Sequence, residues 1–340
     1  MKITFINIGF GEAILVENQG RFILIDGSFD PLCSYGDGTH LPPVEFLKQQ
    51  GVKNLEALVM THPHLDHAGG LYEVLKEIPV QVLWVNALPK WEFSPDRPFV
   101  FNNEPNAETR GNGATENFLQ ALHCFEKMLF FCKAKGIPVK ELFQYQELEC
   151  IGLHFTALSP LTSKQTEYRR GLTLLRETRD SSALTGLAGQ LDAAGNEACL
   201  ALSVRGSGKA AFSALLSSDM GYGFSSSYES APHLLSSQLL KAPHHGHPQG
   251  VPEGFLRAVS PDLVMVCASW DRRYGCPSPL FLEEALTYFK EQPEYGAPEG
   301  RLLFTDCCAI PGFPSSYTRK KAVQIFRDTE TGRLNYKYIP

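Results

Sequence analysis

The sequence predicts a layered α/β fold, and three patterns support this prediction. The first third alternates short β-rich runs with turns, ITFINIG, EAILVEN and RFILIDGS, as an antiparallel meander does. An apolar run, EALVMT, then leads through a polar loop into the helical pattern GGLYEVLKEI. Later apolar runs, such as PDLVMVCAS, alternate with helical ones, such as LFLEEALTYFKEQ. A 43% hydrophobic and 20% charged composition fits a compact folded protein.

The individual elements follow in order along the chain. Asn18-Gln19-Gly20 predicts a hairpin connection between the second and third strands. VEFLKQQGV predicts a short helix that Gly51 closes, and the helix after the polar loop is expected from Ala68. CLALSV, KAAFSALLSSDM and SQLLKAPHHG each predict a strand. VQIFRD and LNYKYIP, joined by TETGR, predict a closing hairpin.

We expect one domain over residues 1–340 with two insertions. Residues 88–117 are rich in Pro, Asn, Gly and Glu and precede an amphipathic helical pattern, so an insertion near 88–135 could cap a site. A second polar excursion is expected near 162–196, before CLALSV. No repeat at solenoid or propeller periods interrupts this organisation.

The bulk composition narrows the class of partner. A net charge of -6, from 37 acidic and 31 basic side chains, gives no global attraction to nucleic acid or to anionic membranes. The N-terminal sequence does not resemble a signal peptide, and no window approaches a membrane span, so a cytoplasmic protein is expected. Nine scattered cysteines favour reduced thiols over a disulfide framework or a zinc knuckle.

The densest chemical signal is the loop Thr61–Gly70. It places three imidazoles and one carboxylate within six residues, namely His62, His64, Asp66 and His67. These are ligand types that divalent ions of intermediate hardness prefer. The first two histidines would serve one ion, and the Asp-His pair would serve another. Two ions a few ångströms apart can polarise a substrate oxygen and give a hydroxide nucleophile near neutral pH.

Further ligands are expected at the ends of later strands. Asp219 ends the apolar run LLSSD and is suited to bridge two cations, although it could equally be a turn residue or an N-cap. LLKAPHHG ends in the doublet His244-His245. Asp26 ends FILID, where it could orient a ligand histidine or begin a turn.

THPHLDHAGG resembles the H-x-H-x-D-H signature of the metallo-β-lactamase superfamily. The opening meander also resembles that family, and LLSSDMG with LLKAPHHG is similar to the metallo-β-lactamase-like domain of ComEC/Rec2 competence proteins. The resemblance extends from Met1 to about Gly312. It implies a four-layer αββα sandwich with the site at one edge of the two packed sheets.

The resemblance also implies a set of metal ligands, which are His62 and His64 on one ion, Asp66 and His67 on the other, Asp219 bridging, and His244 completing the second. His245 would then contact substrate, although the two members of the doublet could be exchanged. The ions would be zinc, with manganese or iron as alternatives. Many family members add a third histidine to the first metal. Here the corresponding stretch offers His123 and His154, and Leu158-Ser159-Pro160 stands where that ligand is sought.

The leading functional hypothesis is hydrolysis, with Asp66 and His245 as catalytic residues and Lys241 or His245 assisting the leaving group. A phosphodiester is the favoured bond because competence-type relatives are associated with nucleic-acid or phosphoester cleavage. The substrate would be a small molecule or a phosphoester. The alternatives are a carboxylic ester, lactone or amide hydrolase, a catalytically silent metal-binding regulatory module, and a DNA-processing partner that the acidic charge does not favour.

Overall fold

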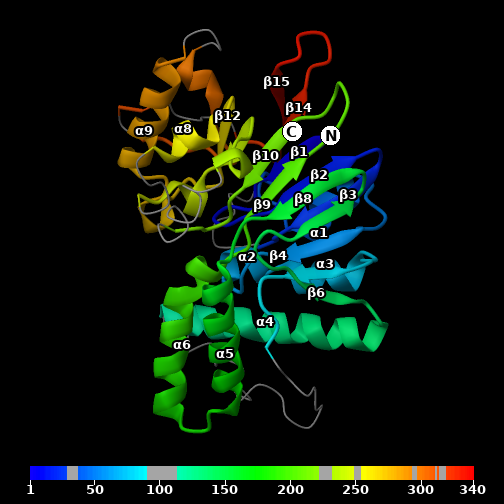
Figure 1. Ribbon diagram of the computed structural model, residues 1–340, viewed down its shortest axis with the longest axis vertical. Helices are drawn as coiled ribbons and strands as arrows, with labels where there is room; N and C mark the ends of the chain where they lie inside the picture. The colour runs from blue at the N-terminus through cyan, green and yellow to red at the C-terminus, as the bar shows by residue number, and fades with distance from the viewer. Residues whose placement is uncertain are drawn as a thin grey trace.

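The fold is described here from a computed structural model, in which two β-sheets stack between layers of helices (Figure 1). The residues that the structure describes are 1–28, 37–89, 113–221, 232–248, 254–292, 297–310, 312–313 and 319–340. Most of the Pro- and Asn-rich segment 88–117 therefore lies outside the described residues. None of the described helices is long and apolar enough to cross a membrane.

The first sheet has eight strands in the order β15-β14-β1-β2-β3-β4-β5-β6. Its strands are β1 (Lys2–Ile6), β2 (Ile14–Asn18), β3 (Arg21–Ile25), β4 (Ala57–Met60), β5 (Leu83–Val85), β6 (Val139–Glu141), β14 (Ala322–Arg327) and β15 (Leu334–Ile339). Asn18 pairs with Arg21 across Gln19 and Gly20, both at positive φ, which confirms the predicted tight hairpin. The C-terminal hairpin of β14 and β15 is also confirmed.

The second sheet has seven strands in the order β13-β12-β11-β10-β9-β8-β7. Its strands are β7 (Glu147–Cys150), β8 (Leu153–Ala157), β9 (Leu202–Arg205), β10 (Ser213–Leu216), β11 (Leu239–Lys241), β12 (Leu263–Val266) and β13 (Leu302–Phe304). Strands β10 to β13 run parallel to one another, so their carboxyl ends meet at one edge of the sheet.

Helices cover the outer face of each sheet. Those on the first sheet are α1 (Pro43–Gln49), α3 (Leu71–Glu77) and α4 (Ala114–Lys135), and those on the second are α8 (Phe255–Val259) and α9 (Pro279–Lys290). The single turn α2 (Leu65–Ala68) follows β4, and α5 (Thr162–Glu177) and α6 (Ser181–Gly195) form a separate helical pair. Short 3-10 turns add η2 (Asn196–Ala198), η4 (Pro232–Leu234), η5 (Pro243–Gly246), η6 (Arg273–Gly275) and η8 (Pro298–Arg301). Pro43 and Pro279 stand in the first turns of α1 and α9, where a missing N–H costs little.

Three apolar clusters hold the layers together. Alternate strand residues of both sheets, such as Phe5 and Phe155, form the central cluster between the sheets. A second cluster packs α1, α3 and α4 on the first sheet, and a third packs α8 and α9 on the second sheet. The order helices, sheet, sheet, helices confirms the expected four-layer αββα sandwich.

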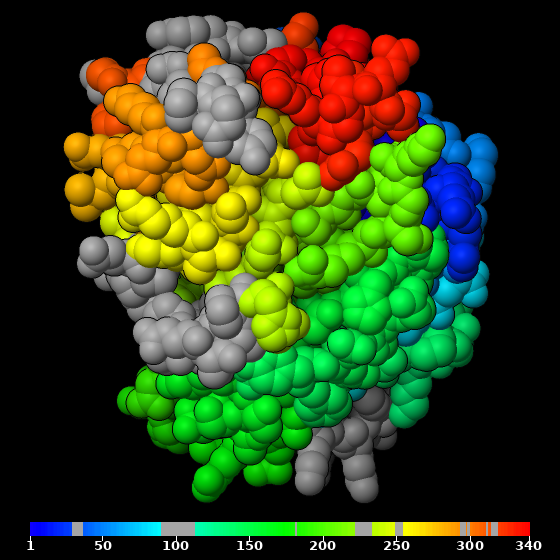
Figure 2. Space-filling view, turned by 45° about the horizontal axis from the view of Figure 1, so that its top comes forward, coloured from blue at the N-terminus to red at the C-terminus, as the bar shows by residue number. Residues whose placement is uncertain are grey.

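The expected excursion near 162–196 contains two helices, α5 and α6, which pack on the N-terminal part of α4 through a separate apolar cluster. This helical segment lies at the opposite end of the molecule from the C-terminal hairpin, as the space-filling view shows in green and red (Figure 2). The chain after α6 then returns directly to the sheet edge, because η2 is followed by β9. The excursion therefore ends beside the edge where the predicted ligands gather.

Three strand ends converge at that edge. The chain leaves β4 at Met60, β10 at Leu216 and β11 at Lys241, immediately before the predicted ligand segments. The Leu200 N–H donates to the Thr61 carbonyl over 2.9 Å, which joins the segment before β9 to the loop after β4. Residues distant in sequence thus meet in one place.

Candidate functional site

The loop after β4 is held by close backbone contacts. Glu12 N–H donates to the Asp66 carbonyl at 2.9 Å, and Gly27 N–H donates to the His67 carbonyl at 2.8 Å. Gly11 has a φ of 127°, and a Cβ there would lie 2.4 Å from the Asp66 oxygen, so only glycine fits. Asp66 and His67 sit in the single turn α2, and the helix predicted from Ala68 begins at Leu71 as α3.

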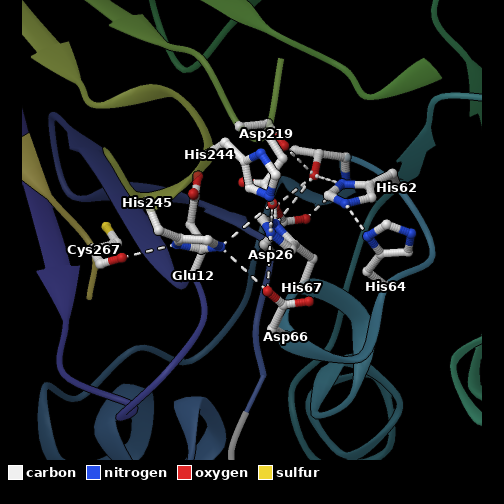
Figure 3. Close-up of polar contacts among 12 residues, drawn as sticks. Glu12, Asp26, His62, His64, Asp66, His67, Asp219, His244, His245 and Cys267 are labelled. Carbon is white, nitrogen blue, oxygen red and sulfur yellow. Dashed lines mark hydrogen bonds and ion pairs between the residues drawn. The ribbon is translucent and has the colours of Figure 1, made fainter. Parts of the chain in front are cut away.

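Four predicted residues form a compact group, namely Asp66, His67, Asp219 and His245 (Figure 3). Each offers one ligand atom, and these atoms all lie within 4.8 Å of one another. His67 Nε2 is 3.3 Å from Asp219 Oδ2. His245 Nε2 is 3.2 Å from Asp66 Oδ2 and 3.4 Å from Asp219 Oδ2. We call this group the four-residue cluster.

Acceptors on the far side of the histidine rings orient the cluster. The Nδ1–H of His67 donates to Asp26 Oδ2 at 2.7 Å, which agrees with the orienting role considered for Asp26. The Nδ1–H of His245 donates to the Cys267 carbonyl at 2.8 Å. Asp26 is held in turn by the N–H and hydroxyl of Thr61, at 2.8 and 2.7 Å. Both rings therefore turn Nε2 towards Asp219, as metal-binding histidines do.

The donor set fits a divalent cation. The buried Nε2 of His67 and Oδ1 of Asp219 have no hydrogen-bond partner among the described residues. Buried polar atoms without partners are costly unless another group satisfies them. Two imidazoles and two carboxylates are ligands that zinc, manganese and iron accept. The cluster is thus a candidate metal site.

His62 and His64 form a separate pair beside the cluster. His62 Nε2 faces His64 Nδ1 at 3.0 Å, and the opposite nitrogen of His64 donates to the Asp192 carbonyl at 3.1 Å. Asp192 Oδ1 lies 3.4 Å from the same nitrogen. Asp192 belongs to α6, so the helical excursion supplies the outer contact of His64, whereas the Thr61 hydroxyl lies 3.0 Å from His62 Nδ1. One nitrogen of each ring faces the other ring, so both nitrogens are placed to bind the same ion.

The structure brings no third histidine to this pair within the described residues. His154 lies on β8 and bonds Glu149 at 2.8 Å, and His123 lies on α4. Ser159 instead joins the segment after β8 to the segment before β9, because its hydroxyl donates to the Cys199 carbonyl at 2.7 Å and accepts from Ala201 N–H at 2.9 Å. The Leu158-Ser159-Pro160 segment therefore has a structural role.

The two members of the doublet lie differently relative to the four-residue cluster. Both have left-handed backbones, with φ of 46° and 55°, so their side chains leave the chain in different directions. His245 is 1% exposed and belongs to the four-residue cluster. His244 is 28% exposed, 3.8 Å from Asp219 Oδ2, and 3.3 Å from the Asn196 amide. The geometry thus favours His245 as ligand and His244 as the residue nearer to substrate.

Burial and neighbouring charges have opposite effects on the pKa values within the cluster. Burial alone would lower the pKa of His67, but Asp219 and Asp26 raise it well above its usual value. For His245, burial is likewise outweighed by Asp219, and its pKa rises to about 9. Burial would raise the pKa of Asp219, but His245 and His67 hold it well below its usual value. Burial lowers the pKa of His244 to about 4. The Asp219 carboxylate is therefore ionised and can bind a cation.

The sequence analysis did not identify Glu12. It is 1% exposed and forms an ion pair with Lys241, which is fully buried and lies 3.6 Å from Asp219 Oδ1. Lys241 also donates to the Ser218 carbonyl at 2.9 Å. The expected contact of Lys241 with a leaving group is therefore wrong, because its ammonium is enclosed behind Asp219. The sequence signal for a buried, paired Glu12 is that it is the one acidic residue in the apolar run GFGEAILV.

Comparison with known proteins agrees with this geometry. Residues 6–120 match the family described as "Metallo-beta-lactamase superfamily", a range that includes the loop after β4. The chain is also similar to ComE operon protein 3 of Bacillus subtilis (strain 168), with 23% identity over 297 residues. That match covers 83% of this chain and 30% of the relative, so the chain spans less than a third of the relative's length.

Similar solved structures include Igni18, a metallo hydrolase from Ignicoccus hospitalis KIN4/I, at 12% identity and a TM-score of 0.40. The match covers 78% of this chain and 82% of Igni18. CmlA, a diiron beta-hydroxylase from Streptomyces venezuelae, is 13% identical with a TM-score of 0.42, over 89% of this chain and 52% of CmlA. The family match over residues 6–120, the curated relative and the four-layer sandwich confirm the resemblance to the metallo-beta-lactamase superfamily that was inferred from THPHLDHAGG.

Proposed function

We propose that this chain hydrolyses a phosphodiester with the help of two divalent cations. The observation that carries the proposal is the four-residue cluster, in which buried ligand atoms of His67 and Asp219 lack hydrogen-bond partners among the described residues. When bound, the cations would supply Lewis acidity and lower the pKa of a water between them. Zinc is favoured by the imidazole and carboxylate donors, with manganese and iron as alternatives.

The ligand roles follow from the two halves of the site. His67, Asp66 and His245 would hold one cation, His62 and His64 would hold the other, and Asp219 would bridge them. Burial lowers the pKa of His62 well below its usual value, which keeps the imidazole neutral and able to donate its lone pair.

Two residues are placed to act on substrate. Asp66 is 23% exposed, against 2% for Asp219, so its carboxylate is accessible to a water and can accept the proton that the water loses. His244 is 28% exposed on the other side of Asp219 and is placed to contact the substrate. Two observations favour a phosphodiester. The first is the resemblance to competence-type proteins. The second is Arg273, whose guanidinium lies over the Phe10 ring, which in turn contacts His245 of the cluster.

The test compares bis(4-nitrophenyl) phosphate with a lactone, using the full chain loaded with zinc, manganese or iron. We expect metal-dependent hydrolysis of the phosphodiester. Asp66→Ala should lower turnover by about 100-fold or more, as loss of a proton acceptor does. His245→Ala should lower both turnover and metal content. His154→Ala is the matched control and should keep both, because His154 is a half-buried histidine of β8 that pairs with Glu147 and Glu149 of β7.

Other outcomes would select the alternatives. Turnover of the lactone alone would favour a carboxylic ester, lactone or amide hydrolase. A protein that binds metal at the four-residue cluster but turns over neither substrate would favour a regulatory module. Either result would reject the phosphodiester proposal.

A further inference from the structure

A row of aromatic rings leads from the four-residue cluster to solvent. The Phe10 ring lies against His245, with 4.9 Å between ring centroids. Tyr274 meets the other side of Phe10 edge-on at 5.3 Å. Phe10 is 4% exposed, whereas Tyr274 is 72% exposed. Tyr274 therefore offers an exposed aromatic ring that the Phe10 ring links to His245 of the cluster.

The turn that carries Tyr274 is held in a rare conformation. Arg272 and Tyr274 both have left-handed backbones, with φ of 49° and 56°. For residues other than glycine this costs on the order of 1–3 kcal/mol, and it persists where surrounding contacts enforce it. The contacts here include Gly275 N–H to the Arg272 carbonyl at 2.8 Å and Arg272 N–H to the Ser269 carbonyl at 3.0 Å. These contacts restrain the backbone that carries the exposed ring.

A cation accompanies the rings. The Arg273 guanidinium lies 5.6 Å from the centre of the Phe10 ring, and the side chain is 31% exposed. The guanidinium also contacts the Asp271 carboxylate at 3.6 Å. Arginine so placed can bind an anionic oxygen while the adjacent tyrosine offers a flat face.

We propose that Tyr274 and Arg273 recognise a nucleotide unit of the substrate, with the base stacked on Tyr274 and a phosphate bound by Arg273. Stacking on an aromatic side chain accepts any base, because every base has a π-face. This assignment rests on the proposed phosphodiesterase function and specifies the class of phosphodiester. It also explains how an acidic chain can bind an anion, since the attraction is local.

The proposal is tested by calorimetric titration of the zinc-loaded full chain with thymidine 5′-monophosphate and, separately, with inorganic phosphate. Tyr274→Ala should weaken binding of the nucleotide by about 10-fold, the loss typical of one stacked base, and leave inorganic phosphate unchanged. Tyr274→Phe should keep both affinities, because stacking needs the ring and not the hydroxyl. Arg273→Gln should weaken both ligands.

Tyr145→Ala is the matched control, because Tyr145 is also an exposed tyrosine, at 44%, with a left-handed backbone at φ 62° on another loop. It should bind both ligands as the parent does. Equal nucleotide affinity in Tyr274→Ala and the parent would overturn the proposal, and so would an equal loss of nucleotide and phosphate in that variant.

The two proposals fail in distinguishable ways. Hydrolysis of bis(4-nitrophenyl) phosphate together with nucleotide binding that does not depend on Tyr274 would reject the recognition site and leave the hydrolase proposal standing. Nucleotide binding that depends on Tyr274, in a protein without hydrolysis, would support the recognition site and reject the hydrolase proposal.

Discussion

The two halves of the candidate site differ in how the fold supports them. The four-residue cluster draws its members from the ends of β4, β10 and β11, and its histidines are oriented by Asp26 and by the Cys267 carbonyl. The pair His62 and His64 has its outer contact from α6, part of the helical excursion. The four-residue cluster is thus supported by the packed sheets. The histidine pair also depends on α6, which packs through a separate apolar cluster.

This difference indicates that the halves bind cations with unequal strength. The four-residue cluster already has four donors within 4.8 Å, whereas the pair offers two imidazoles that face each other at 3.0 Å. A cation at the pair must separate those rings and draw further donors from Asp219 or from solvent. We expect the four-residue cluster to fill first.

Asp219→Ala should have the largest effect, because Asp219 is the donor that both halves share. Metal affinity should fall by more than about 100-fold, beyond the loss typical of an orienting residue. Removal of the carboxylate also leaves the buried charges of Lys241 and His67 with one negative charge fewer beside them, so the free energy of unfolding should fall by about 3–5 kcal/mol. Metal titration and denaturant unfolding would measure the two effects. Retention of two tight metals would contradict the bridging role.

Gly195→Ala should abolish cation binding at His62 and His64 and keep cation binding at the four-residue cluster. A Cβ at Gly195 would lie 2.5 Å from His64 Nε2, so either the end of α6 or the imidazole must move. The metal content should fall from two ions to one. Gly186→Ala, in the same helix with open space around the new Cβ, is the matched control and should keep both ions. A doubly loaded Gly195→Ala protein would show that α6 does not govern the histidine pair.

Asp26→Asn and Asp192→Asn compare the two orienting carboxylates. Asp26 is fully buried and bonds His67 Nδ1 at 2.7 Å, so its replacement should lower affinity for the first cation by about 10- to 100-fold. Asp192 is 24% exposed, and its backbone carbonyl keeps the contact with His64 after substitution, so a smaller loss is expected. Zinc competition with a chromogenic chelator would rank them, and the reverse order would contradict the comparison.

The smallest effect is a dependence on pH. In the metal-free protein the pKa of His245 is raised to about 9, from 6.5. Its protonation therefore stabilises the metal-free fold fully below pH 6.5, and this contribution is lost as the pH rises through 9. A cation competes with the same proton, so zinc affinity should rise over that interval. Thermal melts with and without zinc from pH 6 to 9.5 would measure both trends, and a zinc-induced shift independent of pH would contradict them.

The sequence predicted much of the site because its signals are local. Thr61–Gly70 and LLSSD place ligands directly after apolar strands, and parallel strand ends must meet at one edge. The same logic predicted the layered fold, since the alternation of strands and helices leaves few other ways to bury both faces of each sheet.

Other features depend on geometry that spacing does not specify. The order of roles in His244-His245 follows from two consecutive left-handed residues, which residue type alone does not indicate. The contact of Asp192 with His64 spans 128 positions and depends on how α6 ends. The pairing of Glu12 with Lys241 likewise joins distant segments. Long-range contacts of this kind follow from the packed fold.

The buried Glu12–Lys241 ion pair has a consequence for which ligands the centre can attract. Because Lys241 already neutralises Glu12, the carboxylates left to balance incoming cations are Asp26, Asp66, Asp192 and Asp219. Two divalent ions bring four positive charges against those four negative ones, with neutral imidazoles as the remaining donors. Without Lys241, the Glu12 carboxylate would add a fifth negative charge beside the centre and would repel an incoming anion. The buried pair therefore removes a repulsion that a diester of phosphoric acid, with its one negative charge, would meet and that an uncharged lactone would not.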